Sequence, residues 1–495
     1  MSMEKEKKHP SVFEPFAIVL NLAVSVVGAI IGIQIVTTLG VTPSTSIIGA
    51  LVAMLIARIP MELFRKYKSI HRQNLMQTSI SSATFGAANS LLIPIGIPFI
   101  MGKTELILPM LIGAALAMFI DATLLYKLFD SRIFPARESW APGVATAESI
   151  LAGDKGGKRA GLLGIGALIG VIGSVLKIPM SALGVAFIGN IWALTMFGVG
   201  LLINQYSMPL FQLDVGKLYI AHGIMIGAGI VALIQVAVLI FKREDSAAEA
   251  SKENEAVTVP MRSVKRTLGL GYVAYLAVAV IIAVLGGLMT KMSAGMLIGF
   301  IIFAAFAAFF HELIVGIAAM HSGWFPAFAD MGYDLKTGYI LRGNGSDKEL
   351  EIRGRKQQYY TGMIAFGVAL LTVVLTYKGF FGQNLVPPID KVYASTINAG
   401  ASLDVAMKLL IWAIPGVIIQ WIGGPNRQLG VMLATGLLIV SPNACWAVLG
   451  GILIRVAVLK IKGKEAESTM SILAAGFIAG DALYSFFTSV FKASK

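Results

Sequence analysis

Residues 74–102 read NLMQTSISSATFGAANSLLIPIGIPFIMG, and this stretch decides the fold. It is long enough to cross a bilayer, yet it carries amide and hydroxyl side chains together with Pro94 and Pro98. Polar side chains are costly in hydrocarbon unless they face protein or a watery cavity, and proline frees backbone carbonyls at the same depth. A broken helix that lines a substrate site satisfies both demands. We therefore predict that this helix binds substrate through Asn74, Gln77, Thr78, Ser81 and Asn89.

The composition places the whole chain in a membrane. The chain has 495 residues, of which 56% are hydrophobic and 14% are charged, and its mean hydropathy is +0.78. A soluble globular domain does not carry this excess of apolar residues. Apolar runs that could each cross about 30 Å of hydrocarbon recur from end to end, and we count roughly eleven to fourteen of them. The prediction is an all-α, polytopic membrane protein with additional re-entrant or broken helices.

The formal net charge of +13 comes largely from basic residues in short loops between the apolar runs. This arrangement sets the orientation of a membrane protein and does not indicate nucleic-acid binding. The same rule predicts that the N-terminus, residues 1–10, is cytoplasmic in the inner membrane of the cell. No obvious cleavage site follows the first apolar run, so we expect it to remain as a helix. The single cysteine, Cys445, excludes an intramolecular disulfide and a cysteine-cluster metal site.

The charged residues 242–266 form a linker between two predicted membrane halves, residues 11–241 and 267–495. An apolar run, a basic loop and a helix of small and polar residues follow one another at 49–90, and again at 450–485. Secondary transporters are often built from duplicated halves, so we predict two such halves here. The glycine-rich helix faces would serve internal packing or a homodimer contact, and the sequence leaves both alternatives open.

The second informative segment, residues 138–163, reads ESWAPGVATAESILAGDKGGKRAGLL. The basic loops require one segment of the first half to enter and leave on the same side, and residues 138–153 or 204–216 could do so. Glu148 follows Thr146 there, and its carboxylate would bind a substrate amine or a proton. The alternative is a carboxylate near the cytoplasm that stabilises a helix start and titrates normally. We predict that Thr146 and Glu148 contact substrate.

Acidic and histidine side chains at membrane depth are candidates for a proton pathway, because such groups are rare in membranes without a role. The candidates are Glu148, Asp481, Asp121, His311 and Glu312. The adjacent His311 and Glu312 do not face one ligand on a helix, and their spacing fits no standard metal site, so no bound metal is expected. Asn443, beside Pro442 in an apolar helix, is a further candidate for the cavity wall, with a simple kink as the alternative.

Four blocks of the chain match motifs of a known family, in the same order. The pattern N-x-x-Q-T-x-x-S from Asn74 to Ser81, followed by Ile-Pro at 93–94, is one motif, and PGVATAESILAGDKGGKRA at 142–160 is a second. Residues 436–455 and 474–483 match the last two helices, with Asp481 where the motif usually has glutamate. By these blocks the chain resembles the oligopeptide transporter family, which includes the yellow-stripe-like metal-chelate transporters.

The resemblance implies a compact, prokaryotic-type secondary transporter that imports small oligopeptides by proton symport, or metal-chelate complexes as the alternative. Its partners would be the substrate, protons and lipid, with no cofactor. The chain has no G-x-x-x-x-G-K-[ST] loop, so it carries no recognisable ATP motor. It has no G-x-S-x-G or H-E-x-x-H motif, so no enzyme is expected. A channel would need a ring-forming filter motif, and none is seen.

Overall fold

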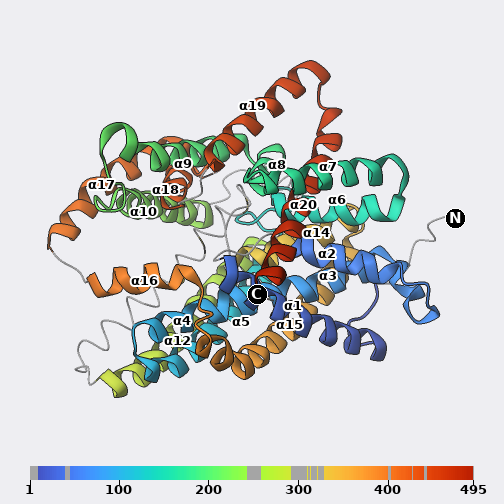
Figure 1. Ribbon diagram of the computed structural model, residues 1–495, viewed down its shortest axis with the longest axis horizontal. Helices are drawn as coiled ribbons and strands as arrows, with labels where there is room; N and C mark the ends of the chain where they lie inside the picture. Colours follow the sequence, from blue (N-terminus) through green and yellow to red (C-terminus); the bar gives the residue numbers. More distant parts are fainter. Residues whose placement is uncertain are drawn as a thin grey trace.

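The computed structural model describes residues 9–39, 45–241, 258–290, 309, 313, 320, 328–399, 403–425, 427–439 and 443–493. Within these residues the protein is all-helical (Figure 1). The β-type pairing found in them is an isolated bridge between Phe129 and Phe134. The predicted all-α fold class is therefore confirmed.

The helices before residue 242 are α1 (Pro15–Leu39), α2 (Thr45–Ala57), η1 (Glu62–Lys68), α3 (Ile70–Phe85), η2 (Gly86–Leu92), α4 (Ile93–Ile100), η3 (Thr104–Leu106), α5 (Ile107–Leu128), α6 (Ala141–Lys155), α7 (Gly157–Val175), α8 (Met180–Ile188), α9 (Ile191–Phe211) and α10 (Ile220–Phe241). Those after it are α12 (Met261–Thr290), α14 (Phe328–Leu341), α15 (Lys348–Gly382), α16 (Pro388–Ala399), α17 (Leu403–Gly423), α18 (Leu429–Leu438), α19 (Ala444–Lys462) and α20 (Ala466–Ala493).

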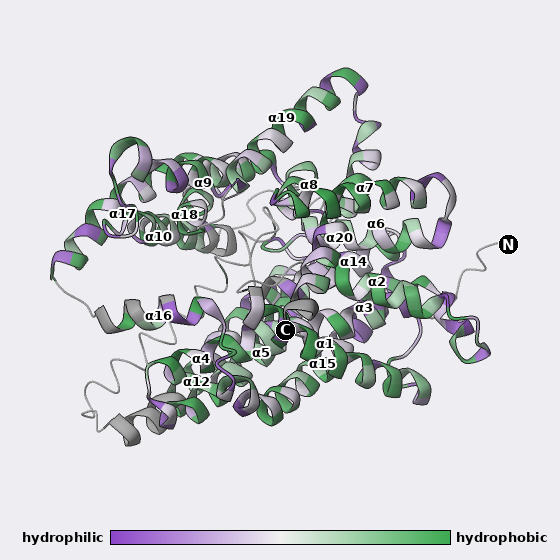
Figure 2. Ribbon diagram, viewed as in Figure 1, coloured by the Kyte–Doolittle hydropathy of each residue, from purple (hydrophilic) through white to green (hydrophobic). Residues whose placement is uncertain are grey.

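The described helices have the length and the surface of membrane helices. Eight of them are long and apolar enough to cross a bilayer, and shorter apolar helices lie at Thr45–Ala57, Ile220–Gln235 and Leu429–Leu438. Large apolar side chains point outward, among them Leu168 of α7 and Leu453 of α19. Hydrophilic residues gather at helix ends and in connections (Figure 2). Because this much apolar surface needs lipid around it, the protein is a multi-pass membrane protein.

Helices from the two ends of the chain pack against one another. α20 packs along α7, α17 along α10, and α18 along α9, and α15 packs against both α1 and α3. The helices α9, α10, α17 and α18 form one group at the upper left of Figure 1. The predicted halves are therefore interleaved, and their duplication stays a prediction. The order of helix, basic connection and helix that suggested it is present as α2–η1–α3 and as α19–α20.

The two segments considered as re-entrant differ in structure. Residues 204–211 continue the long helix α9 to Phe211. Residues 141–155 instead form the separate short helix α6, which packs against α2, α14 and α20. The short helix α6 therefore stands beside the centre of the molecule, next to the helices that build the polar site described below.

Glycines bring the backbones of α7 and α20 into direct contact. A Cβ atom added at Gly170 would lie 2.5 Å from the backbone oxygen of Phe477, and one at Gly476 would lie 2.6 Å from the Cα of Gly166. Real Cβ atoms essentially never approach other atoms this closely. Small residues are how membrane helices reach such short separations, since lipid gives no hydrophobic drive for helices to associate.

We predict that Gly170→Ala lowers the thermal stability of the detergent-solubilised protein, because its methyl group forces α7 and α20 apart. The expected cost is roughly 1–3 kcal/mol of the free energy of unfolding. The melting temperature is measured by size-exclusion chromatography after heating. Gly164→Ala is the matched control, because the same helix has open space at that position. Equal melting temperatures for the two variants would show that this contact does not limit stability.

Candidate functional site

Helix α3 is polar and yet buried. Every residue from Gln73 to Phe85 is buried, although this part of the helix carries Asn74, Gln77 and Thr78. The helix is enclosed by α1, α2, α14 and α15. A polar helix can be buried in this way only if its side chains find hydrogen-bond partners on the helices around it. The residues that the sequence singled out at 74–81 therefore lie in the interior of the protein.

The expected break in the 74–102 helix takes the form of a change in hydrogen bonding. α3 passes directly into the π-helix η2, which is followed by α4 with Pro94 at its start and Pro98 inside it. Asn89 lies in this π-helix and is half-buried. Segments of π-helix inside α-helices occur frequently at functional sites. The irregular part of the helix thus follows its buried polar part.

Two aspartates that the sequence analysis did not select face the polar side of α3. Asp330 and Asp334 are one turn apart on α14, and they are 3% and 0% exposed. Residues at this spacing lie on one face of a helix. We call them the carboxylate pair.

The first carboxylate, Asp330, accepts hydrogen bonds from α2 and α3. The hydroxyl of Thr45 donates to it over 2.9 Å, and the hydroxyl of Ser81 lies 3.1 Å from the same oxygen. Thr45 is the first residue of α2, and Asp330 lies in the first turn of α14. The starts of helices carry partial positive charge and unpaired N–H groups, which favour a nearby carboxylate.

The second carboxylate, Asp334, joins the same three helices. The side-chain amide of Gln77 donates to its Oδ1 over 2.5 Å, and the hydroxyl of Ser46 donates to the same oxygen over 3.0 Å. Ser46 and Ser81 are also hydrogen-bonded to each other at 3.0 Å. The two aspartates therefore belong to a single polar cluster in which α2 and α3 supply the donors and α14 supplies the acceptors.

Asn74 extends this cluster by one residue. Its amide nitrogen donates to Oε1 of Gln77 over 3.1 Å, which orients the Gln77 amide toward Asp334. The Oδ1 atom of Asn74 is buried and has no hydrogen-bond partner within the described residues. An unused buried acceptor costs free energy, so a ligand that donates a hydrogen bond would find a partner here.

Gln358 of α15 links the cluster to a buried ion-pair network. Its amide nitrogen donates to the backbone oxygen of Asp334 over 2.7 Å, and its Oε1 accepts from Arg342 over 2.8 Å. Arg342 holds Glu351 with two hydrogen bonds, of 2.7 and 3.2 Å. Arg355 donates to the same Glu351 over 3.1 Å and lies 3.6 Å from Asp130.

The charges of the network balance, whereas those of the carboxylate pair do not. The network contains two arginines, Arg342 and Arg355, and two acids, Glu351 and Asp130. Within the described parts of the chain, no lysine, arginine or histidine forms an ion pair with Asp330 or Asp334. Two buried carboxylates without a cation are unfavourable when both are ionised. The pair therefore calls for a proton or a bound cationic group.

The other predicted residues lie outside this cluster. Glu148 forms a 2.7 Å ion pair with Arg159 of α7, and the Thr146 hydroxyl donates to the backbone oxygen of Pro142 over 2.7 Å. Asp481 accepts from the hydroxyl of Ser174 over 2.6 Å and from the backbone N–H of Ser181 over 2.9 Å, and so ties together α20, α7 and α8.

Three further predicted residues complete this account. Asp121 accepts a hydrogen bond from the hydroxyl of Tyr275. Asn443 is exposed in front of α19, where its backbone N–H donates to Gln205 over 3.3 Å. His311 and Glu312 lie outside the described residues. The structure does not bring these residues to the carboxylate pair, and their proposed roles stay predictions.

A signal for the missed pair was present in the sequence. Asp330 and Asp334 follow a long apolar stretch with the four-residue spacing of one helix face. What the sequence does not reveal is their partners, because Gln77 and Asp334 are 257 positions apart.

We predict that Glu351→Gln lowers the free energy of unfolding by roughly 3–5 kcal/mol, because it leaves buried arginines without a counter-charge. Glu349→Gln on the same helix is the control, since its ion pair with Arg353 is exposed and surface pairs contribute about 0–1 kcal/mol. Thermal unfolding in detergent measures both variants. If Glu351→Gln were as stable as the control, the network would not be a stabilising element.

His9 covers the outer end of the network. Its ring lies near Arg342 and Gly354, and 5.0 Å from the ring of His71. Burial, together with the positive charge of Arg342, lowers the pKa of His9 from 6.5 to about 3. The imidazole is therefore neutral in the folded protein at any pH at which the protein would work.

This lowered pKa predicts a loss of stability in acid. Below pH 6.5 the unfolded chain binds a proton at His9 that the folded chain does not bind until about pH 3. Stability is therefore fully present above pH 6.5 and falls below it by up to about 1.4 kcal/mol per pH unit. His9→Asn should flatten the decline of melting temperature between pH 7 and pH 5, whatever its stability at pH 7. Parallel declines for the wild type and the variant would contradict the assignment.

An all-helical body with a lipid-facing apolar surface, built around buried carboxylates at helix starts, has the architecture of a membrane transport protein. A comparison with family models identifies the group. The model described as OPT oligopeptide transporter protein matches residues 15–241 and 325–492, and the chain belongs to this family. No curated protein and no solved structure matches the chain. The matched residues include every member of the carboxylate pair and of the α3 cluster.

Proposed function

We propose that this protein is a secondary active transporter that imports small oligopeptides by proton symport, with the carboxylate pair as the site of coupling. Membership of the oligopeptide transporter family supports transport of oligopeptides or related compounds. The observation that carries the mechanism is that Asp330 and Asp334 are buried, are held by five side-chain donors, and have no cationic partner within the described residues.

The chemistry of the pair suits an exchange between a proton and a substrate amine. When a proton occupies the pair, the burial of one negative charge is avoided. When the ammonium group of a peptide binds, it supplies the missing positive charge and can donate to Asp330, Asp334 and the unused oxygen of Asn74. A site that favours a neutral state and a cation-bound state couples proton movement to substrate binding.

The notebook of alternatives for the proton pathway remains short. Glu148, with Arg159 beside it, and Asp481, which caps α8, are further proposed members of the pathway. Import of metal-chelate complexes by the same mechanism is the alternative function, since amino-acid-derived chelators carry similar amine and carboxylate groups. Placement in the inner membrane with a cytoplasmic N-terminus belongs to the same proposal, on the strength of the basic connections.

The first test is Asp334→Asn in proteoliposomes under an inward proton gradient. We expect the peptide-evoked, pH-dependent current to fall about tenfold or more, equivalent to about 1.4 kcal/mol of lost coupling or binding free energy. Asp404→Asn is the matched control, because Asp404 is exposed on α17 beside Lys408. Gel filtration confirms that both variants fold. A normal current in Asp334→Asn would remove the pair from the mechanism.

The substrate class is tested with the same preparation. Di- to hexapeptides are compared with the same peptides acetylated at the N-terminus, and with iron and nickel chelates. We expect free peptides to evoke current and acetylated ones to lose it, because acetylation removes the ammonium group. Current with chelates alone would favour the alternative function, and equal currents with free and acetylated peptides would contradict the amine contact.

A further inference from the structure

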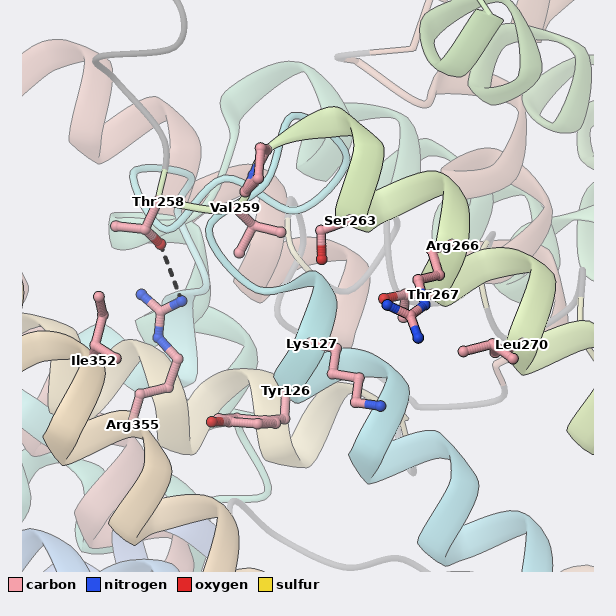
Figure 3. Close-up of a pocket in the computed structure, with 11 residues that line it drawn as sticks. Tyr126, Lys127, Thr258, Val259, Ser263, Arg266, Thr267, Leu270, Ile352 and Arg355 are labelled. Carbon is pink, nitrogen blue, oxygen red and sulfur yellow. Dashed lines mark hydrogen bonds between the residues drawn. The ribbon is translucent and has the colours of Figure 1, made fainter.

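A pocket of about 550 Å³ lies where the end of α5, the start of α12 and the first turns of α15 meet (Figure 3). It is separate from the carboxylate pair, and the proposed transport mechanism does not use it. Its walls combine basic and hydroxyl side chains with a few apolar ones, and the residues that matter here are Lys127, Ser263, Arg266, Thr267, Leu270 and Arg355.

The floor of the pocket is built by Arg355, which is 5% exposed. Its guanidinium group donates to Glu351, to the backbone oxygen of Phe129 and to the hydroxyl of Thr258. Figure 3 shows the last of these contacts at one end of the pocket. Because its donors are already used, Arg355 fixes the shape of the floor and leaves ligand binding to the residues of the rim.

The rim carries positive charge that the protein does not neutralise. Lys127 of α5 and Arg266 of α12 are exposed, and neither forms an ion pair with a residue in the described part of the chain. The acids nearest to the floor, Asp130 and Glu351, are bound to Arg355. The pocket therefore presents two cations without a counter-charge.

One face of α12 lines the pocket. Ser263, Arg266, Thr267 and Leu270 follow one another at three- and four-residue spacing, so the hydroxyls and the guanidinium group share this face. Thr267 is 6% exposed. Hydroxyl and guanidinium donors on a common face suit an oxyanion such as phosphate, which accepts several charge-assisted hydrogen bonds.

The pocket lies where polar groups give way to lipid-facing ones. Leu270 and Val273 of α12 and Ile352 of α15 are more than half exposed. Basic residues at the start of a membrane helix, next to lipid-facing side chains, are placed at the level of lipid headgroups. A ligand here would find donors for a phosphate group and, directly beside them, apolar surface for acyl chains.

We propose that this pocket binds the phosphate group of an anionic phospholipid, with Lys127, Arg266, Ser263 and Thr267 around the phosphate and the acyl chains along Leu270 and Val273. Free inorganic phosphate shares the headgroup chemistry but not the acyl chains. The two sources are therefore distinguished by experiment.

The test measures lipid binding to the purified full-length protein by native mass spectrometry, with short-chain phosphatidylglycerol and phosphatidylcholine as probes. The double variant Lys127→Gln/Arg266→Gln is compared with Arg65→Gln/Lys217→Gln, which removes two exposed cations elsewhere and changes the net charge equally. Loss of two basic contacts at a membrane surface should weaken phosphatidylglycerol binding about 30-fold, equivalent to about 2 kcal/mol.

The outcomes separate cleanly. Preferential binding of phosphatidylglycerol that survives in the control and is lost in the double variant supports the proposal. Equal binding of phosphatidylglycerol by the two double variants overturns it. Displacement of phosphatidylglycerol by millimolar inorganic phosphate, with phosphate bound as tightly as the lipid, would overturn the lipid assignment. All four substituted residues are exposed, and gel filtration checks that each variant folds.

Discussion

The constraint on which the rest of the structure depends is that a polar helix, α3, is buried within a membrane protein. Hydrocarbon offers its amides and hydroxyls no partners, so the surrounding helices must supply them. Ser46 of α2, Asp334 of α14 and Gln358 of α15 do so through contacts of 2.5 to 3.2 Å. These contacts require helices from both ends of the chain to meet at α3, which is why the two halves are interleaved.

Burial of charge then divides the interior into two parts with different properties. In the network of Arg342, Glu351 and Arg355, each charge has an opposite partner, and such a network orders the protein without changing its charge. In the carboxylate pair the negative charge lacks a partner within the described residues, so its state depends on what binds. We infer that the first part holds the architecture and the second part carries the transported species, which is the basis of the proposed function.

The sequence predicted the membrane class, the all-helical fold, the family and the buried polar helix, because each depends on local composition or on short motifs. It did not predict the carboxylate pair, since Asp330 gains its meaning only from Thr45 and Ser81, which are distant in the sequence. Glu148 attracted attention as an isolated acid, yet Arg159 pairs with it one helix further on. Acid residues alone are thus visible in a sequence, whereas the presence or absence of their counter-charges is a property of the fold.

The measurement that tests this account most directly is infrared difference spectroscopy of the purified protein upon addition of a dipeptide, at a pH near neutrality. The account predicts a band from a protonated carboxyl group that changes when the peptide binds, and that is absent when Asp330 and Asp334 are both replaced by asparagine. A carboxyl signal that does not respond to peptide, or that responds unchanged in the double variant, would contradict the claim that this pair couples protons to substrate.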